Sequence, residues 1–357
     1  MRRGAKRFGS ADRHWADSDL DRELLDVFSE FSPRCNQRID AVRRQLDGWL
    51  EEHGLVQGET ARGRIARADL GQFAALTYPT AEEDTLCLAA DWFAWLILLD
   101  DHLDDGRLGL DTDRVAGLVE GIMAILGLAG DISPGSLPPR GDPAILAAFA
   151  ELAMRTFSLG TERWSHRFVE HIADSGRAAF WEAENRIHGI IPDERTYIAN
   201  RRHTGAVLVC LDLIEILDQI QLPDTLYFSA PVQRCLLAAA DVICWTNDLY
   251  SLEKEAALGE HHNLVLVIEH ADGLGRGEAV RRTIQKIAER IAVFKTAEGI
   301  AIETFPEHDE ILEKYFAGLR AWMRGNLDWS AGTARFRAMG DARSETGDYL
   351  EEEIIGE

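Results

Sequence analysis

Four aspartates lie within six residues of one another, directly after an apolar segment at residues 92–99: Asp100, Asp101, Asp104 and Asp105. On a helix, residues four apart are neighbours, so these carboxylates would form two adjacent pairs. Like charges at this spacing repel each other, and either a proton or a shared cation relieves the repulsion. Carboxylate oxygens favour hard cations such as Mg²⁺, Mn²⁺ or Ca²⁺. The pattern indicates a divalent-metal site, with a solvated acidic turn at the helix end as the alternative.

A second set of oxygen donors lies further along the chain, where Asn247, Ser251 and Glu255 are spaced four residues apart. On a helix this spacing places an amide, a hydroxyl and a carboxylate on one stripe. All three are hard donors suited to Mg²⁺. Asp248 and Glu253 would point elsewhere, as solvent-facing or supporting groups. Such a stripe alone is ordinary helix surface, but beside an aspartate-rich helix end it indicates the second half of a metal site.

The two sets together resemble the metal motifs of class I terpene synthases of the bacterial type. Residues 100–104 match the aspartate-rich motif of that family, and residues 247–255 match its NDxxSxxxE motif without a substitution. The resemblance extends over about residues 30–337. It implies three Mg²⁺ ions, with Mn²⁺ as a substitute, that clamp the diphosphate of an isoprenoid substrate between two facing helices. The metal ligands it implies are Asp100, Asp101, Asp104, Asp105, Asn247, Ser251 and Glu255.

The resemblance also implies a cationic group that senses the diphosphate. Residues 197–205 match the segment that carries this arginine in the family. Arg201 is preferred to Arg202, because its separation from Asn247 is the one usual in the family. Arg202 is expected to be a surface charge or to pair with a nearby acid.

Thr204 and Gly205 then occupy the linker and effector positions of a helix break, and a glycine suits a kinked helix. The family role of the carbonyl exposed there is to help expel diphosphate. Lys254 and Arg335 match two further cations that contact the leaving group. Phe336 departs from the family, which usually has tyrosine at this position. The substitution removes one hydrogen bond to diphosphate, an interaction worth about 1.5–3 kcal/mol.

The resemblance implies ionisation and cyclisation of a linear isoprenyl diphosphate to a cyclic terpene, with farnesyl diphosphate favoured and diphosphate released. Bound metal ions would act as Lewis acids, and closure would exclude water from the carbocation. Aromatic ring faces would stabilise the successive cations. The residues expected on the cavity wall, with plain core packing as the alternative, are Trp92, Leu96, Ile97, Cys210 and Trp322. Aromatic residues are common in the family at positions 96 and 97, so the aliphatic Leu96 and Ile97 predict a wider cavity. A wider cavity favours a larger or less tightly folded substrate.

Three other functions are compatible with parts of the pattern. The same chemistry could act on geranylgeranyl diphosphate, which would make the chain a diterpene synthase. A chain-elongating prenyl diphosphate synthase is disfavoured, because such enzymes carry two aspartate-rich motifs. A non-catalytic helical metal-binding protein would explain the acids but not Arg201, Lys254 and Arg335.

The elements that must position these groups are predicted to be helices. Apolar residues recur at helical spacing, or run uniformly apolar, in eight segments: 36–52, 84–100, 144–158, 164–185, 205–220, 230–255, 276–296 and 309–328. Residues 264–268 look like a strand but have no partner, which favours a buried helix start. About ten helices without alternating strands predict an all-α fold. The resemblance implies that this fold is the class I terpenoid synthase bundle with a central apolar cavity.

Chain length and composition bound the remaining properties. The 357 residues suit one large domain at residues 21–339, with a mobile extension at 1–20 and a mobile acidic tail at 340–357. Lys plus Arg total 38 and Asp plus Glu total 61, so the net charge of −23 argues against nucleic-acid and anionic-membrane partners. Five scattered cysteines, no apolar run near the ~20 residues of a membrane span and no signal-peptide pattern indicate a cytoplasmic protein. A monomer or a homodimer is expected.

Overall fold

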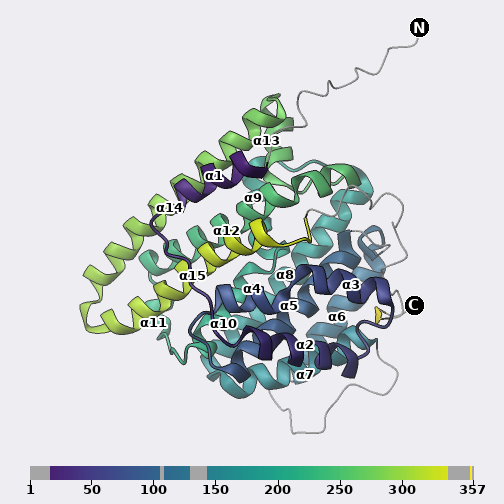
Figure 1. Cartoon of the computed structure of the whole chain (residues 1–357), viewed down its shortest axis with the longest axis horizontal. Coiled ribbons are helices and arrows are strands. Elements are labelled where there is room, and N and C mark those ends of the chain that lie inside the picture. The colour runs from purple at the N-terminus through teal and green to yellow at the C-terminus, as the bar shows by residue number, and fades with distance from the viewer. Residues whose placement is uncertain (1–16, 105–107, 129–142, 337–353, 356–357) are drawn as a thin grey trace.

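The computed structural model describes residues 17–104, 108–128, 143–336 and 354–355, and these residues form helices without any strand (Figure 1). The all-α prediction is confirmed. The helices up to residue 188 are α1 (Asp17–Val27), α2 (Ile39–Glu52), α3 (Glu59–Ala68), α4 (Leu70–Thr77), α5 (Glu83–Asp104), α6 (Thr112–Leu128), α7 (Ala144–Leu159) and α8 (Glu162–His188), with the 3₁₀ turn η2 (Leu108–Leu110). The later helices are α9 (Glu194–Thr204), α10 (Val207–Leu217), α11 (Asp224–Tyr227), α12 (Ala230–Leu258), α13 (Leu264–Asp272), α14 (Arg276–Thr304) and α15 (Asp309–Gly332), with the 3₁₀ turn η3 (Pro306–His308).

The helix predictions from periodicity are confirmed, and the structure adds helices that they missed. All eight predicted segments overlap an observed helix, and residues 264–268 begin α13 rather than form a strand. Six of the described helices had no prediction: α1, α3, α4, α6, α9 and α11. The described part of the chain therefore contains more helices than the ten expected.

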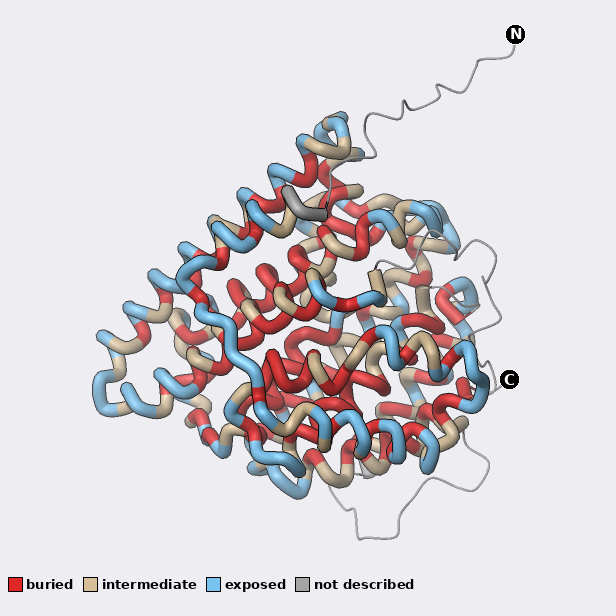
Figure 2. The backbone as a smooth tube through the Cα atoms, in the orientation of Figure 1, coloured by how far each residue is buried: buried red, intermediate tan, exposed pale blue. Residues whose placement is uncertain are grey.

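The two helices that carry the metal motifs lie largely inside the bundle. Helix α5 is buried on all sides from Leu86 to Trp95, which explains its uniformly apolar sequence. Helix α12 packs on α9, α10, α13, α14 and α15. Figure 2 shows both helices largely buried, with exposure concentrated on the outer helices. The oxygen-rich motifs are therefore carried on rigid elements.

Local sequence signals set the ends of the helices around the site. Asp193 caps α9 by accepting from the Thr196 N–H at 2.9 Å, and Asn263 caps α13 by accepting from the Val265 N–H at 2.9 Å. Gly259 ends α12 with a φ of +82°, a left-handed conformation that glycine adopts without steric cost. These caps fix where the site helices start and stop.

The chain termini differ in part from the predicted mobile segments. Helix α1 begins at Asp17, inside the predicted extension at 1–20, and Ile354 and Ile355 in the predicted tail are buried. The rest of both segments lies outside the described residues, so the domain limits stay a prediction. No helix in the described ranges has the length and apolar character to span a membrane.

Candidate active site

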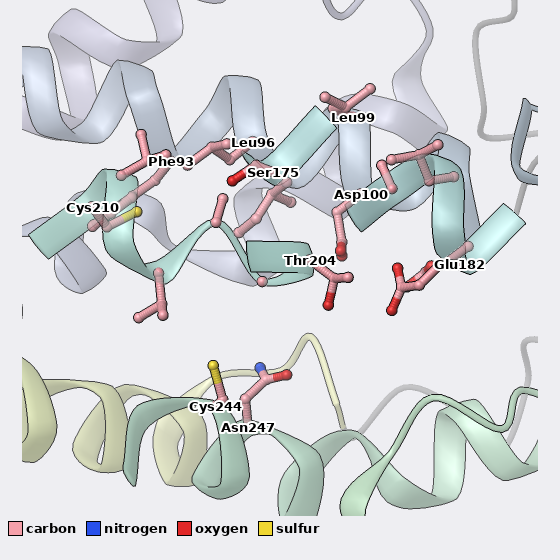
Figure 3. Close-up of a pocket in the computed structure, with 18 of the residues that line it drawn as sticks. Phe93, Leu96, Leu99, Asp100, Ser175, Glu182, Thr204, Cys210, Cys244 and Asn247 are labelled. Atoms are coloured by element: carbon pink, nitrogen blue, oxygen red, sulfur yellow. The ribbon is translucent and has the colours of Figure 1, made fainter. Parts of the chain in front are cut away.

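A cavity lies between the C-terminal half of α5 and the middle of α12, and both metal motifs open onto it. Figure 3 shows Asp100 projecting from one wall and Asn247 from the other. Ser251, Lys254 and Glu255 of α12 also line the cavity, as do Asp100 and Asp104 of α5. The fold thus brings the two predicted oxygen-donor sets to opposite walls of one space. Asp105 lies outside the described residues.

The aspartate-rich end of α5 is surrounded by cations. Asp101 accepts hydrogen bonds from Arg335 Nη2 at 2.7 Å and Arg64 Nη2 at 2.9 Å, and Lys254 Nζ lies 3.8 Å away. Burial opposes ionisation of Asp101, but the three nearby positive charges hold its pKa well below the usual range. Asp101 is therefore a carboxylate enclosed by positive charge.

Asp100 lies one residue earlier, and its pKa is shifted in the opposite direction from that of Asp101. Desolvation in the cavity and then repulsion by Asp104 raise the pKa of Asp100 to about 7, although Arg335 Nη2 approaches it at 3.2 Å. Its side chain keeps 49% exposure toward the open cavity. A divalent cation would relieve the repulsion that raises this pKa.

The donor stripe on α12 is held in place by hydrogen bonds. Asn247 Oδ1 accepts from Arg201 Nη2 at 2.9 Å, and Ser251 Oγ donates to the Asn247 carbonyl at 2.9 Å. Glu255 accepts from the Asn263 side-chain amide at 2.8 Å. Burial, and then repulsion by Asp248, raise the pKa of Glu255 to about 8. The stripe therefore contains an acid that a bound cation would favour in its ionised form.

Asp248 organises the region behind this stripe. It is fully buried and accepts from Arg201 Nε at 2.9 Å, Tyr197 Oη at 2.7 Å and the Leu264 N–H at 3.0 Å. The prediction that Asp248 is solvent-facing is wrong, and its alternative as a supporting group is correct. Glu253 is exposed. Asp248 ties α9, α12 and α13 together and orients Arg201.

The helix break after α9 has a different origin from the one expected. Gly205 has an ordinary φ of −75°, and the left-handed residue is Ala206, with a φ of +49°. Position 205 has little room for a side chain, because a Cβ there would lie 2.7 Å from Arg201 Nη1. The glycine therefore makes room for the arginine, and the alanine carries the strained backbone.

The remaining predicted residues are also near the cavity. Its wall includes Trp92, Leu96, Ile97, Cys210 and Trp322, along with Thr204, Gly205, Arg335 and Phe336. Trp92 is almost wholly enclosed and its indole N–H donates to Thr156 Oγ1 at 2.9 Å, so packing accounts for much of its position. Arg202 binds both carboxylate oxygens of Asp241, as the acid-pairing alternative predicted.

Two arginines that bind the aspartate-rich end of α5 were not predicted from the sequence. Arg64 comes from α3, where no helix was predicted. Arg186, on α8, binds Asp104 and donates from Nε to Glu260 at 2.5 Å, which joins the end of α5 to the loop after α12. Neither arginine lies in a recognisable motif. Only the three-dimensional arrangement reveals their partners.

The donor set fits a divalent cation shared between two walls. Among the described residues, no three His, Cys, Asp or Glu side chains converge into a complete metal site. The donors of α12 include an amide and a hydroxyl, and those of α5 are across the cavity. Burial raises the pKa of both Asp100 and Glu255, and repulsion by a neighbouring aspartate raises it further, although Arg335 lies 3.2 Å from Asp100. Additional positive charge beside these two acids would favour their ionised forms. A cation that takes donors from both helices would supply it.

This helical bundle, with its two oxygen-donor motifs facing each other across a cavity, defines a metal-dependent terpene synthase. The family model described as "Terpene synthase family 2, C-terminal metal binding" matches residues 91–292. The chain belongs to this terpene synthase family and is an enzyme of the terpene cyclase class, a carbon–oxygen lyase that acts on diphosphates.

Curated relatives and solved structures agree with this assignment. The chain is 35% identical over 306 residues to (+)-T-muurolol synthase of Roseiflexus castenholzii, covering 86% of this chain and 91% of the relative. It is 35% identical over 325 residues to (−)-delta-cadinene synthase of Streptomyces clavuligerus, covering 88% and 94%. A cucumene synthase variant superposes with a TM-score of 0.74 at 27% identity, covering 85% of this chain and 98% of that structure.

Proposed function

We propose that this enzyme ionises and cyclises farnesyl diphosphate to a cyclic sesquiterpene and releases diphosphate, with three Mg²⁺ ions bound between α5 and α12. The observation that carries the proposal is the convergence of both donor motifs and four cationic side chains, Arg186, Arg201, Lys254 and Arg335, on one largely apolar cavity. The (+)-T-muurolol relative is named for cyclisation of farnesyl diphosphate, which supports the same substrate here.

The proposed metal ligands are the described members of the two motifs. They are Asp100, Asp101, Asp104, Asn247, Ser251 and Glu255. Bound Mg²⁺ would supply Lewis-acid stabilisation of the departing diphosphate. Mn²⁺ has similar oxygen preferences and is the proposed substitute.

The cations of the chain have a direct role in the proposed ionisation. Arg201, Lys254 and Arg335 line the cavity and would bind the oxygens of the diphosphate, where negative charge accumulates as the allylic C–O bond breaks. Each is already held near the site by a carboxylate or amide. Asp248 holds Arg201 in its orientation, whereas Lys254 and Arg335 would have to exchange Asp101 for the diphosphate.

The apolar part of the cavity would fold the chain and shield the carbocation from water. Phe93, Leu96 and Cys210 project into it in Figure 3, and Trp322 adds an aromatic face. Aromatic faces attract cations through the ring quadrupole. These side chains would therefore select the folded shape of the substrate.

The test is incubation of the purified enzyme and Mg²⁺ with geranyl, farnesyl and geranylgeranyl diphosphate in separate reactions, with analysis of the hydrocarbons and alcohols formed. The proposal expects cyclic C15 products from farnesyl diphosphate as the main activity. Main activity on geranylgeranyl diphosphate would overturn the substrate assignment. A fourth reaction adds isopentenyl diphosphate, and longer prenyl diphosphates there would indicate chain elongation instead.

A further inference from the structure

Three hydroxyl side chains line the described cavity, and two of them already donate a hydrogen bond. Ser175 Oγ donates to the His171 carbonyl at 2.9 Å, and Ser251 Oγ donates to the Asn247 carbonyl at 2.9 Å. Thr204 Oγ1 is buried and has no hydrogen-bond partner. Thr204 therefore carries the uncommitted hydroxyl among these three.

Thr204 differs from the helical threonines of this protein that satisfy their hydroxyl locally. Thr156 and Thr283 donate to the carbonyl four residues earlier, at 2.7 and 3.0 Å. This bond is the common local solution for a helical threonine. A buried hydroxyl that makes no such bond is unfavourable in the folded protein. A ligand that accepts from it would remove this cost.

The position of Thr204 indicates the ligand. It is the last residue of α9 and lies three residues after Arg201, so both side chains share one face of the helix. In Figure 3 the Thr204 side chain points into the space that Asp100, Glu182 and Asn247 also face. Ionised carboxylates around this space can only accept hydrogen bonds, and a diphosphate bound there would bring further acceptor oxygens.

The cavity wall beside Arg335 has no hydroxyl at position 336. Phe336 lines the cavity next to Arg335, and its ring packs edge-on against Trp329 with centroids 5.7 Å apart. A phenyl ring cannot donate a hydrogen bond. The cavity therefore has aromatic packing beside Arg335 and an unused donor beside Arg201.

We infer that the Thr204 hydroxyl donates a hydrogen bond directly to the substrate diphosphate and supplies the donor that Phe336 does not. This inference rests on the proposed function, since it requires diphosphate to bind between α5 and α12. It gives Thr204 a binding role beyond its place in the helix break. A hydrogen bond to a charged group corresponds to a change in affinity of about 10- to 100-fold.

The test measures calorimetric binding of inorganic diphosphate in the presence of Mg²⁺ to the full-length enzyme and its variants. Thr204→Val keeps the shape and removes the hydroxyl, and it is expected to weaken diphosphate binding about 10- to 100-fold. Thr204→Ser keeps the hydroxyl and is expected to bind within about threefold of the wild type. Equal affinity of Thr204→Val and the wild type, or an equal loss in both variants, would overturn the inference.

Thermal unfolding of the metal-free enzyme separates a binding role from a structural one. Because the hydroxyl is buried without a partner, Thr204→Val is expected to unfold at the same or a higher temperature than the wild type. A lower unfolding temperature would show that the hydroxyl has a structural partner, and would count against the inference. Thr246 is the matched control, since its hydroxyl is also buried without a partner but is not on the cavity wall. Thr246→Val is expected to leave diphosphate affinity unchanged.

Phe336→Tyr tests whether the two positions compensate for each other. In the Thr204→Val background, Phe336→Tyr is expected to raise the affinity for diphosphate at least tenfold. In the wild type, the same substitution is expected to raise that affinity by a smaller factor. Equal gains in both backgrounds would overturn the compensation. Failure of the wild type to bind diphosphate with Mg²⁺ would instead refute the proposed function, so the two failures are distinguishable.

Discussion

Replacement of Asp248 by asparagine is expected to lower the free energy of unfolding by about 3–5 kcal/mol, the usual cost of removing one partner from a buried ion pair. Asp248 is fully buried and accepts from three donors, one of them the guanidinium of Arg201. Burial opposes the charge on Arg201, and Asp248 holds the pKa of that side chain well above its usual value. Asparagine keeps an acceptor oxygen but removes the negative charge, so the buried guanidinium loses its counter-ion.

Equilibrium urea unfolding of the metal-free enzyme measures this effect, because the midpoint and slope together give the free energy of unfolding. Glu253→Gln on the same helix is the matched control. Glu253 is exposed and lies 3.6 Å from Arg276, an ion pair of the kind worth about 0–1 kcal/mol. The control is expected to change stability by less than about 0.5 kcal/mol.

A second measurement addresses the orientation of Arg201. Without Asp248, the arginine keeps its bond to Asn247 but loses the contact that fixes its Nε. The KM for farnesyl diphosphate is therefore expected to rise in Asp248→Asn more than in Glu253→Gln. A stability loss below about 1 kcal/mol for Asp248→Asn would refute the reasoning, since it would show that Arg201 does not depend on this charge.

Three other predictions follow from the site. In the metal-free enzyme the pKa values of Asp100 and Glu255 are raised to about 7 and about 8, so the folded state holds protons that the unfolded state releases. The free energy of unfolding is therefore expected to fall as pH rises from about 4 to 8. In thermal unfolding, Mg²⁺ is expected to reverse this loss at pH 8 and to have little effect at pH 5. Gly205→Ala places a methyl group 2.7 Å from Arg201 Nη1 and is expected to lower kcat at least tenfold in steady-state assays, whereas unchanged kcat would show that the arginine can move without consequence. Leu96→Phe adds bulk to the cavity wall and is expected to change the distribution of products in gas chromatography, and an unaltered distribution would contradict the assignment of this wall.

The sequence allowed prediction of those parts of the site that depend on spacing along one helix. Asp100 and Asp104, or Asn247 and Ser251, are neighbours on any helix, so their shared face follows from periodicity alone. The partners of Asp248 come from α9 and α13, and no local pattern contains that information. Arg186 binds residues of two other elements for the same reason.

The helix break shows a different limit of sequence analysis. A glycine at position 205 suggests that the backbone there adopts a left-handed conformation, yet the left-handed residue is Ala206. The glycine instead leaves space for the Arg201 side chain. Both explanations predict a glycine at a kink, and only the dihedral angles separate them. The short helices α3 and α4 were missed because each has too few turns for a clear apolar period.

The contacts of Asp101 have a consequence for which anions the enzyme would accept. In the structure Arg64, Lys254 and Arg335 all lie within 4 Å of this one carboxylate, so each cation already has an anionic neighbour before any ligand arrives. A phosphate compound alone must compete with a buried carboxylate for them, in a protein whose net charge of −23 already repels it. A divalent ion that engages the carboxylate would release those cations toward the incoming diphosphate. The enzyme would thus bind the divalent ion and the anion together, and it would discriminate against phosphate compounds that arrive without a divalent ion.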